Sequence, residues 1–231
     1  MIKYYGTPIT PKSVFKYVFE NKERNVLIPF TQKQDFNKSL KYAKKIIIDN
    51  GAFTIWKRGG IIKWDDYYEW IYEIFEYIEF FLIPDVIDGT EIENDKLIKD
   101  YFSRNISKGV PIWHINESIE RLEELISKFD YIAFGSAGEY STLGTLEWNK
   151  KMNEAMMVCC DKNGIPIVKI HMLRCLNPKI FTKYPFYSGD STNLARNHKR
   201  DGVDNILSRI EKYNSPKKYY FKKYYKTKSL F

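Results

Sequence analysis

Short runs of β-branched and aromatic residues recur along the chain, and stretches with helical periodicity separate them. Runs of this length and composition are typical of buried strands. We predict strands at residues 25–30, 46–48, 81–83, 110–113, 131–134, 165–170 and 186–188. Apolar side chains spaced three or four positions apart predict helices at residues 14–19, 65–80, 97–102, 119–129 and 148–159. Asp65 is expected to cap the helix at residues 65–80, because its carboxylate can accept from the first free amide groups.

The alternation of strands and helices indicates a parallel sheet, because each return to the same end of a sheet requires a crossover. The number of strands favours an α/β fold of the (β/α)8 type, a TIM-like barrel that is either complete or lacks a unit. An open, doubly wound sheet is the alternative. No glycine-rich dinucleotide fingerprint or phosphate-binding loop follows a predicted strand, which argues against the nucleotide-binding form of that alternative.

Three aspartates stand at or just beyond the ends of predicted strands: Asp49, Asp85 and Asp190. A barrel brings the carboxyl ends of all its strands to one face, where catalytic groups gather. Several carboxylates around one mouth suit chemistry at an anomeric carbon, which needs one group to attack and another to move protons. The alternative for a loop aspartate is to cap the turn or helix that follows it.

The same predicted rim carries two histidines, His114 and His171, and a small-residue loop at residues 135–138. Each histidine fits either a ligand pocket or an ordinary hydrogen bond at the rim. The loop fits either a tight turn or backbone amides that approach a flat ligand closely.

Composition and charge narrow the class of protein. The 231 residues are 44% hydrophobic and 29% charged, with a formal net charge of +8, which favours an anionic partner such as nucleic acid. The three cysteines form no CxxC pair, no Cys/His cluster has zinc spacing, and no secretory leader is recognised. We therefore predict a cytoplasmic protein with no disulfide, metal or cofactor. No apolar run approaches the ~20 residues that span a bilayer, so no membrane partner is expected. The oligomeric state stays open.

We divide the chain into a barrel domain, residues 1–212, and a basic, aromatic tail, residues 213–231. Lysine pairs alternate with aromatic pairs in this tail, a pattern that suits phosphate contacts and base stacking. The lysines predicted to bind nucleic acid are Lys217, Lys218, Lys222 and Lys223. The alternative is a solubilising tail whose aromatic side chains pack on the barrel.

Several short motifs resemble those of tRNA-guanine transglycosylases. Residues 49–53 (Asp-Asn-Gly-Ala-Phe) are similar to that family's Asp-Ser-Gly-Gly-Phe motif, and residues 83–85 (Ile-Pro-Asp) to its base-recognition strand end. Residues 134–139 (Phe-Gly-Ser-Ala-Gly-Glu) resemble its glycine-containing loop. Residues 171–173 (His-Met-Leu), followed by Asp190, resemble the segment that carries the nucleophile. The motifs occur in the family's order between residues 46 and 192.

The chain departs from the tRNA enzymes in being shorter and in lacking Cys and His at the spacing of their C-terminal zinc site. It looks most like a compact branch of the superfamily, the phage deazapurine DNA transglycosylases (DpdA). That resemblance implies a single TIM-like domain without the zinc-binding subdomain. It also implies exchange of guanine in DNA for a 7-deazaguanine base such as 7-cyano-7-deazaguanine.

The resemblance also implies a role for individual residues. Asp190 would form a covalent glycosyl-enzyme, Asp49 would move protons to and from the bases, and Asp85 would hold the guanine-like edge. Amides of the loop between Gly135 and Gly138 would donate to the base carbonyl. The remaining residues expected to bind substrate are Phe53, His114, Ser118, Ser136 and His171.

Three other functions fit the same residues. A tRNA-modifying transglycosylase would use the same carboxylates on RNA. A glycosidase or nucleosidase would use water as the acceptor. A non-catalytic barrel would bind nucleic acid, with the basic tail as its active part.

Overall fold

A computed structural model describes residues 1–61 and 63–221. These residues contain nine strands in one sheet, in the order β5-β4-β3-β2-β1-β9-β8-β7-β6, and every pairing is parallel. The strands are β1 (Ile2–Gly6), β2 (Asn25–Pro29), β3 (Ile46–Asp49), β4 (Phe80–Leu82), β5 (Gly109–Val110), β6 (Ile112–His114), β7 (Tyr131–Gly135), β8 (Lys169–Met172) and β9 (Ser188–Ser191).

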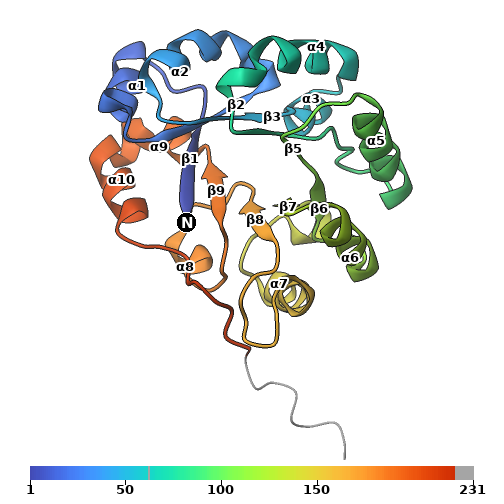
Figure 1. Cartoon of the computed structure of the whole chain (residues 1–231). Coiled ribbons are helices and arrows are strands. Elements are labelled where there is room, and N and C mark those ends of the chain that lie inside the picture. The colour runs from blue at the N-terminus through green and yellow to red at the C-terminus, as the bar shows by residue number, and fades with distance from the viewer. Residues whose placement is uncertain (62, 222–231) are drawn as a thin grey trace, which may run out of the picture.

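Helices connect successive strands and cover the outside of the sheet (Figure 1). They are α1 (Lys12–Phe19), α2 (Phe36–Tyr42), α3 (Ala52–Lys57), α4 (Trp64–Ile74), α5 (Glu91–Ser103), α6 (Ile119–Lys128), α7 (Leu146–Cys159), α8 (Pro178–Phe181), α9 (Asn193–Asp201) and α10 (Val203–Glu211). Short 3₁₀ helices occur at η1 (Glu20–Lys22), η2 (Phe30–Asp35), η3 (Phe75–Tyr77) and η4 (Gly138–Tyr140).

The two edges of the sheet, β5 and β6, are halves of one short stretch that Pro111 interrupts. The carbonyl of Val110 accepts from Ile83 N (2.9 Å), next to β4, and the carbonyl of Pro111 accepts from Ala133 N (2.9 Å) in β7. Adjacent residues thus bond to opposite neighbours, and the sheet curls into a nearly closed barrel. Counting β5 and β6 as one strand gives the eight units of a TIM-like barrel, which confirms the predicted fold.

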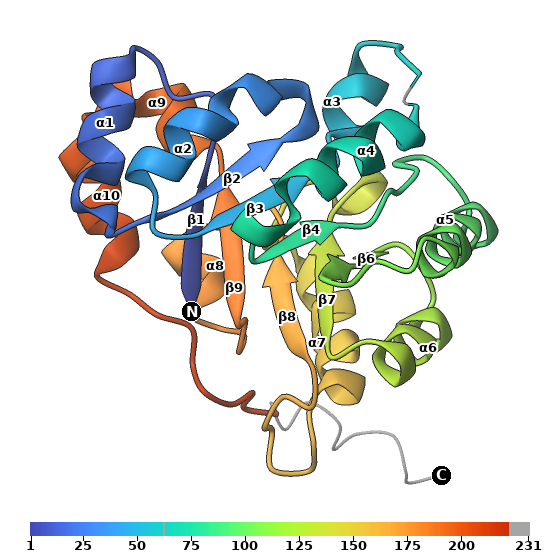
Figure 2. The same ribbon diagram turned by 45° about the horizontal axis from the view of Figure 1, so that its top comes forward.

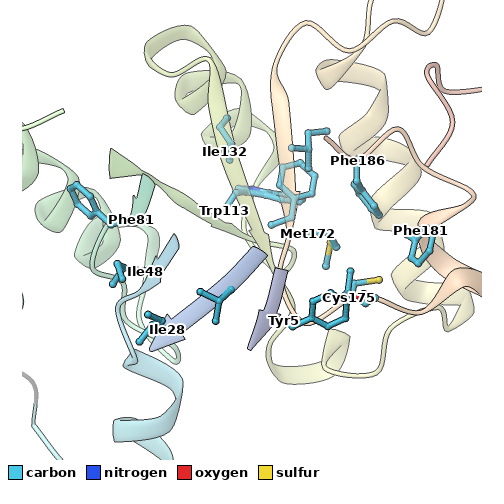
Figure 3. Packing of buried hydrophobic residues seen from close by; sticks show 14 of the residues in the cluster. Tyr5, Ile28, Ile48, Phe81, Trp113, Ile132, Met172, Cys175, Phe181 and Phe186 are labelled. Atoms are coloured by element: carbon cyan, nitrogen blue, oxygen red, sulfur yellow. The ribbon is translucent and has the colours of Figure 1, made fainter. Parts of the chain in front are cut away.

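Alternation along the strands sorts apolar side chains into two layers, since successive residues of a strand point to opposite faces. One set fills the barrel interior: Tyr4, Leu27, Ile47, Phe80, Leu82, Val110, Ile112 and Ala133. The other set lies between the strands and the helices, where Figure 3 labels Tyr5, Ile28, Ile48, Phe81, Trp113, Ile132 and Met172 among others. The second set is the main core, and it holds the helices on the barrel.

Three strand predictions were wrong in detail. The first 25 residues gave no predicted strand, yet residues 2–6 form β1, which lies between β2 and β9. The strand predicted at 165–170 is β8, which begins only at Lys169, because the preceding residues turn back and form an isolated antiparallel bridge between Cys160 and Pro166. The last strand was predicted to end before Asp190, which instead lies inside β9.

The start of α4 also differs from the prediction that Asp65 caps it. The N-cap residue is Lys63 and makes no side-chain capping bond, so Asp65 lies inside the first turn. There its carboxylate pairs with Arg104 Nη2 at 2.7 Å.

The described part of the tail, residues 213–221, packs against the barrel. Tyr219 is buried, stacks on Tyr184 (centroids 6.2 Å apart), and donates through its hydroxyl to Asn153 Oδ1 at 2.7 Å. Its amide also donates to the Gly164 carbonyl at 2.7 Å. At least this aromatic side chain therefore packs as the alternative interpretation of the tail expects.

Candidate active site

Polar side chains occupy the inward positions at the carboxyl ends of the strands. Asp49 lies two residues beyond the inward Ile47, and His114 two beyond the inward Ile112. Asp190 pairs in register with Tyr4, which is also inward. Residues two apart on a strand, or paired in register, share a face. The barrel therefore places these side chains around one mouth, above an apolar interior, at the end marked by the arrowheads of β7, β8 and β9 in Figure 2.

Asp49 is held at the end of β3 by the turn that follows it. Gly51 adopts a left-handed conformation (φ 79°), which favours glycine, and its amide donates to Asp49 Oδ1 at 3.1 Å. The structure thus gives Asp49 a turn contact, as the capping alternative expects, and still leaves it at the mouth. The remaining oxygen, Oδ2, has no hydrogen-bond partner among the described residues.

Asn50 joins Asp49's strand to Asp85. Its side-chain amide donates to the Ile83 carbonyl (2.9 Å) and to Asp85 Oδ1 (2.8 Å), and its oxygen accepts from Ala52 N (2.9 Å). All three contacts are made by one buried side chain. Asn50 therefore fixes the distance between the β3 and β4 ends of the site.

His114 supports the other oxygen of Asp85. Its Nε2 lies 2.9 Å from Asp85 Oδ2, and both side chains are buried. Burial alone would lower the pKa of His114, but the adjacent carboxylate of Asp85 and the charge of Glu117 raise it above its usual value. Asp85 is thus paired with a histidine whose cationic form is favoured.

The ring of His114 also explains one predicted glycine. A Cβ at Gly135 would lie 2.9 Å from His114 Nδ1, so a larger residue there would displace the ring. This Nδ1 is buried and has no hydrogen-bond partner among the described residues. Gly135 therefore leaves the space that the His114 ring occupies.

Glu117 holds the part of the site formed by the ends of β4 and β6. Its carboxylate accepts from the His114 amide (2.8 Å), from Asn94 Nδ2 (3.0 Å) and from Arg121 Nη1 (2.6 Å). Asn94 in turn accepts from Val86 N at 2.8 Å. The loop after β4 and the end of β6 are thereby held to helices α5 and α6 by one buried network.

Asp190 is buried at the end of β9, and one of its oxygens takes all its protein contacts. Oδ1 accepts from the Arg174 amide at 3.0 Å and lies 3.3 Å from His171 Nε2. Oδ2 has no hydrogen-bond partner within residues 1–61 and 63–221. One oxygen of Asp190 is therefore positioned and the other is available.

A chain of polar groups runs from Asp190 down into the barrel. His171 Nδ1 contacts Ser188 Oγ, which lies 2.6 Å from the hydroxyl of Tyr131. All three contacts are satisfied when Tyr131 donates to Ser188, Ser188 to Nδ1, and Nε2 to Asp190. In this arrangement His171 Nε2 donates to Asp190 Oδ1.

Asp49 and Asp190 share the mouth but differ in their environments. Burial is the main cause that raises the pKa of Asp49 to about 7; the opposing Gly51 amide and Arg174 lower this pKa, and the negative charges of Asp190 and Asp85 add to the rise. Asp190 instead receives two donors on one oxygen. Two carboxylates in unlike environments are the arrangement that separates an acid–base group from a nucleophile.

Arg174 closes one side of the mouth. It has a left-handed backbone (φ 56°), its guanidinium lies 4.6 Å from the centroid of the Phe53 ring, and it donates to the Ser136 carbonyl. Burial lowers the pKa of Arg174, while the charges of Asp190 and Asp49 act in the opposite direction. Phe53 and Ser136, both predicted from sequence, are thus joined at the mouth by a residue that was not predicted.

Two other residues predicted to bind substrate, Ser118 and Ser136, make hydrogen bonds that stabilise the fold, and a third, Gly138, lies in open space. The Ser118 hydroxyl accepts from Arg121 N as the cap of α6 (3.1 Å) and donates to Glu91 Oε2 (3.0 Å). Ser136 Oγ accepts from Trp148 Nε1 at 3.0 Å. Gly138 is exposed, and space around it is open. Of these, only Ser136 is connected to the mouth, through Arg174.

Sequence reasoning assigned no role to Asn50, Arg174, Ser188 or Tyr131. Ser188 had a signal, since it precedes Asp190 by two positions and so faces the same way. Asn50 had one as well, because it is adjacent to Asp49. Arg174 had none, since the turn after β8 determines where its amide and guanidinium point.

The predicted nucleic-acid-binding lysines lie elsewhere. Lys217 lines a hollow together with Met1, Ile2 and Pro166, at the amino-terminal end of the barrel. Lys218 is its neighbour, and both are exposed; the segment that follows α10 passes the end of the barrel opposite the arrowheads of β8 and β9 (Figure 2). Lys222 and Lys223 lie outside the described residues.

The described residues contain no group of three or more His, Cys, Asp and Glu that could hold a metal ion, so they do not fit the zinc site of the tRNA enzymes. In residues 1–61 and 63–221, no helix has both the length and the apolar character needed to cross a membrane.

Comparisons with known proteins bear on the fold. No protein-family model matches the sequence, and a search of curated proteins finds no match. The chain is similar to a solved structure from Aquifex aeolicus VF5, described as "Structural study of Project ID", with a TM-score of 0.54. The two share 13% identity, over 91% of this chain and 90% of the other. At that identity the likeness shows the fold alone: an α/β TIM-like barrel.

Proposed function

We propose that this protein is a transglycosylase that exchanges guanine in DNA for a 7-deazaguanine base, such as 7-cyano-7-deazaguanine. The observation that carries the proposal is the pair Asp49 and Asp190, two carboxylates at one mouth with different environments. The resemblance of the flanking motifs to tRNA-guanine transglycosylases supports the choice of bases.

Asp190 is the proposed nucleophile. Its Oδ2 attacks C1′ of the target nucleotide, the bond from C1′ to the base nitrogen breaks, and the electron pair leaves with guanine. Donors on Oδ1 hold the carboxylate in position during this step. The product is a covalent glycosyl-enzyme, with the sugar still part of the DNA strand.

Asp49 is the proposed proton-transfer group. A pKa of about 7 keeps both of its protonation states populated near neutral pH. The protonated form delivers a proton to the leaving guanine. The resulting carboxylate then takes a proton from the incoming 7-deazaguanine, whose ring nitrogen attacks C1′ and releases Asp190.

Asp85 is the proposed acceptor for the base edge. Asn50 and His114 each occupy one of its oxygens, but each carboxylate oxygen has a second acceptor position. Those positions suit the N1–H and exocyclic amine of guanine and of 7-deazaguanine. The unpartnered His114 Nδ1 beside Gly135 is a further polar atom that a base can contact.

DNA is proposed as the polymer from the resemblance to the compact branch, and tRNA is the competing substrate. In either polymer the target base must leave its stack, at a cost of a few kcal/mol.

The experiment is to trap the intermediate. Wild-type protein is incubated with a guanine-containing oligonucleotide and quenched in denaturant, and the covalent adduct is measured by gel shift and mass spectrometry. Adduct is expected with wild type and with Asp88→Asn, an exposed rim control, and is expected to be lost in Asp190→Ala. An adduct that persists in Asp190→Ala excludes this nucleophile.

Labelled-guanine exchange on DNA and on tRNA of defined sequence then identifies the polymer. Exchange on tRNA alone would replace DNA by tRNA in the proposal. Release of base without incorporation would identify a glycosidase, and binding without either reaction a non-catalytic barrel.

A further inference from the structure

A groove begins at the mouth and continues down the outside of the barrel between α8 and the α9–α10 pair. Its volume is about 860 Å³, within the ~300–1,000 Å³ typical of binding sites. Arg174, Ser191 and Asn193 line the end nearest the mouth, and Lys179, Arg209 and Tyr213 line the remainder. The groove adjoins the site, because two of its lining residues are next to Asp190: Ser191 follows it in β9, and the amide of Arg174 bonds to it.

The charge of this groove is one-sided. Its described lining includes three cations and no acidic residue. Within the described part of the chain, Lys179 and Arg209 form no ion pair, whereas Arg24, Arg104 and Arg121 each pair with a carboxylate. Cations that protein carboxylates leave uncompensated favour an anionic occupant.

The groove also offers an aromatic surface. Tyr213 is 43% exposed, and Lys212 Nζ lies 5.7 Å from the centroid of its ring. A basic groove with an exposed aromatic ring is the combination that binds single-stranded nucleic acid, through phosphate contacts and base stacking. A small anion would use the cations alone and would leave the ring and the length of the groove without a role.

We propose that this groove binds the single DNA strand on one side of the exchanged nucleotide. Lys179 and Arg209 contact its phosphates, and Tyr213 stacks on a base. This inference rests on the proposed function for the choice of DNA, and it adds the path by which the strand leaves the mouth. It moves the cationic contacts from the tail lysines to the side of the barrel next to Asp190, and Tyr213 is the one tail residue that it keeps as a contact.

The test compares two double substitutions that remove the same charge. Lys179→Ala/Arg209→Ala alters the groove, and Lys217→Ala/Lys218→Ala alters exposed lysines at the opposite end of the barrel. Binding of a fluorescein-labelled single-stranded DNA is measured by anisotropy across a salt series, in an Asp190→Asn background so that no covalent step contributes. Thermal melting of each variant checks its folding.

The groove variant is expected to bind about tenfold more weakly at physiological salt, with the slope of log affinity against log salt smaller by about 1.4, since each phosphate contact on a single strand contributes ~0.7. The tail variant is expected to match the parent. Tyr213→Leu, which removes the ring and keeps apolar bulk, is expected to weaken binding about fivefold or more without changing the slope. If the alanine pair melts early, Lys179→Gln/Arg209→Gln provides the same charge change.

Equal affinity and slope in the groove variant and the parent would overturn the proposal, as would an equal loss in the tail variant. Tighter binding of RNA of the same sequence would overturn the choice of DNA. In the catalytically competent protein, the groove variant is expected to raise KM for the oligonucleotide and leave kcat unchanged. Because anisotropy does not require chemistry, absence of base exchange would refute the proposed function without affecting the groove result.

Discussion

The apolar interior of the barrel and its polar mouth are built from the same strands but carry different kinds of side chain. In the lower layer, which is the apolar set of side chains inside the barrel below the mouth, β3 presents Ile47. This side chain is fully buried among apolar neighbours. Two residues later the same face presents Asp49, a half-buried carboxylate at the mouth. The backbone pattern is identical, so the difference lies in which side chain each position carries and what surrounds it.

The two positions contribute to the free energy of folding with opposite signs. Burying Ile47 stabilises the fold, whereas burial of Asp49, together with its closeness to Asp190 and Asp85, penalises its ionised form. The apolar layer and the outer core offset this cost. A mouth that holds several acids together is therefore expected to be a source of instability in this protein.

The largest expected effect comes from the lower layer. Ile47→Ala removes buried methyl groups from a site with no exposed surface, and is expected to lower the free energy of unfolding by about 2–5 kcal/mol. Urea denaturation monitored by circular dichroism measures it. Ile92→Ala, at an exposed position on α5, is the control and is expected to change stability by less than about 0.5 kcal/mol. Similar losses in both variants would contradict the distinction between the layers.

In the same strand, replacing Asp49 by asparagine is expected to raise the free energy of unfolding, whereas replacing Ile47 by alanine lowers it. Because the folded-state pKa of Asp49 is raised from 3.8 to about 7, the folded protein holds this proton more tightly than the unfolded chain does. Its contribution to stability therefore falls as pH rises from about 4 to 7, and an asparagine cannot lose stability in this way.

The free energy of unfolding of Asp49→Asn is accordingly expected to equal that of wild type near pH 4 and to exceed it by about 1–3 kcal/mol near pH 8. This range is smaller than the full ~1.4 kcal/mol per pKa unit because Asp49 is partly exposed. Denaturation at the two pH values measures the difference. Asp88→Asn, at an exposed rim position, is expected to show no such pH-dependent gain. A variant less stable than wild type at the higher pH would refute this account of the mouth.

The smallest effect concerns the polar chain that joins the two layers. Tyr131→Phe removes the hydroxyl that contacts Ser188 while keeping the ring, and is expected to cost about 0.5–1.5 kcal/mol in stability. If the chain positions Asp190, kcat for base exchange falls about fivefold with KM unchanged. Tyr187→Phe, whose exposed ring packs on Tyr131, is the control and is expected to leave both kcat and KM unchanged. A loss of stability with unaltered kcat would assign the chain to folding alone.

Sequence reasoning recovered the barrel because its evidence is local and repeated. Each β-branched run and each amphipathic stretch carries its own periodic signal, and repetition of the unit indicates a parallel barrel. The exceptions have local causes. The strand β1 contains Lys3 between apolar residues and lacks a preceding unit, and the start of β8 depends on a turn and a single antiparallel bridge.

For the site, the sequence by itself determined that Asp49, Asp85 and Asp190 lie at or near strand ends, and the parallel topology makes such positions meet at one face. Only the tertiary structure decided the rest. Asp190 Oδ1 accepts a hydrogen bond from the Arg174 amide. His114 pairs with Asp85 and occupies the space that Gly135 leaves open. Lys217 lies at the end of the barrel opposite the mouth. The physical reason is that strand periodicity depends on neighbours in the chain. Hydrogen-bond partners, burial and shifted pKa values depend on groups brought together from distant strands and turns.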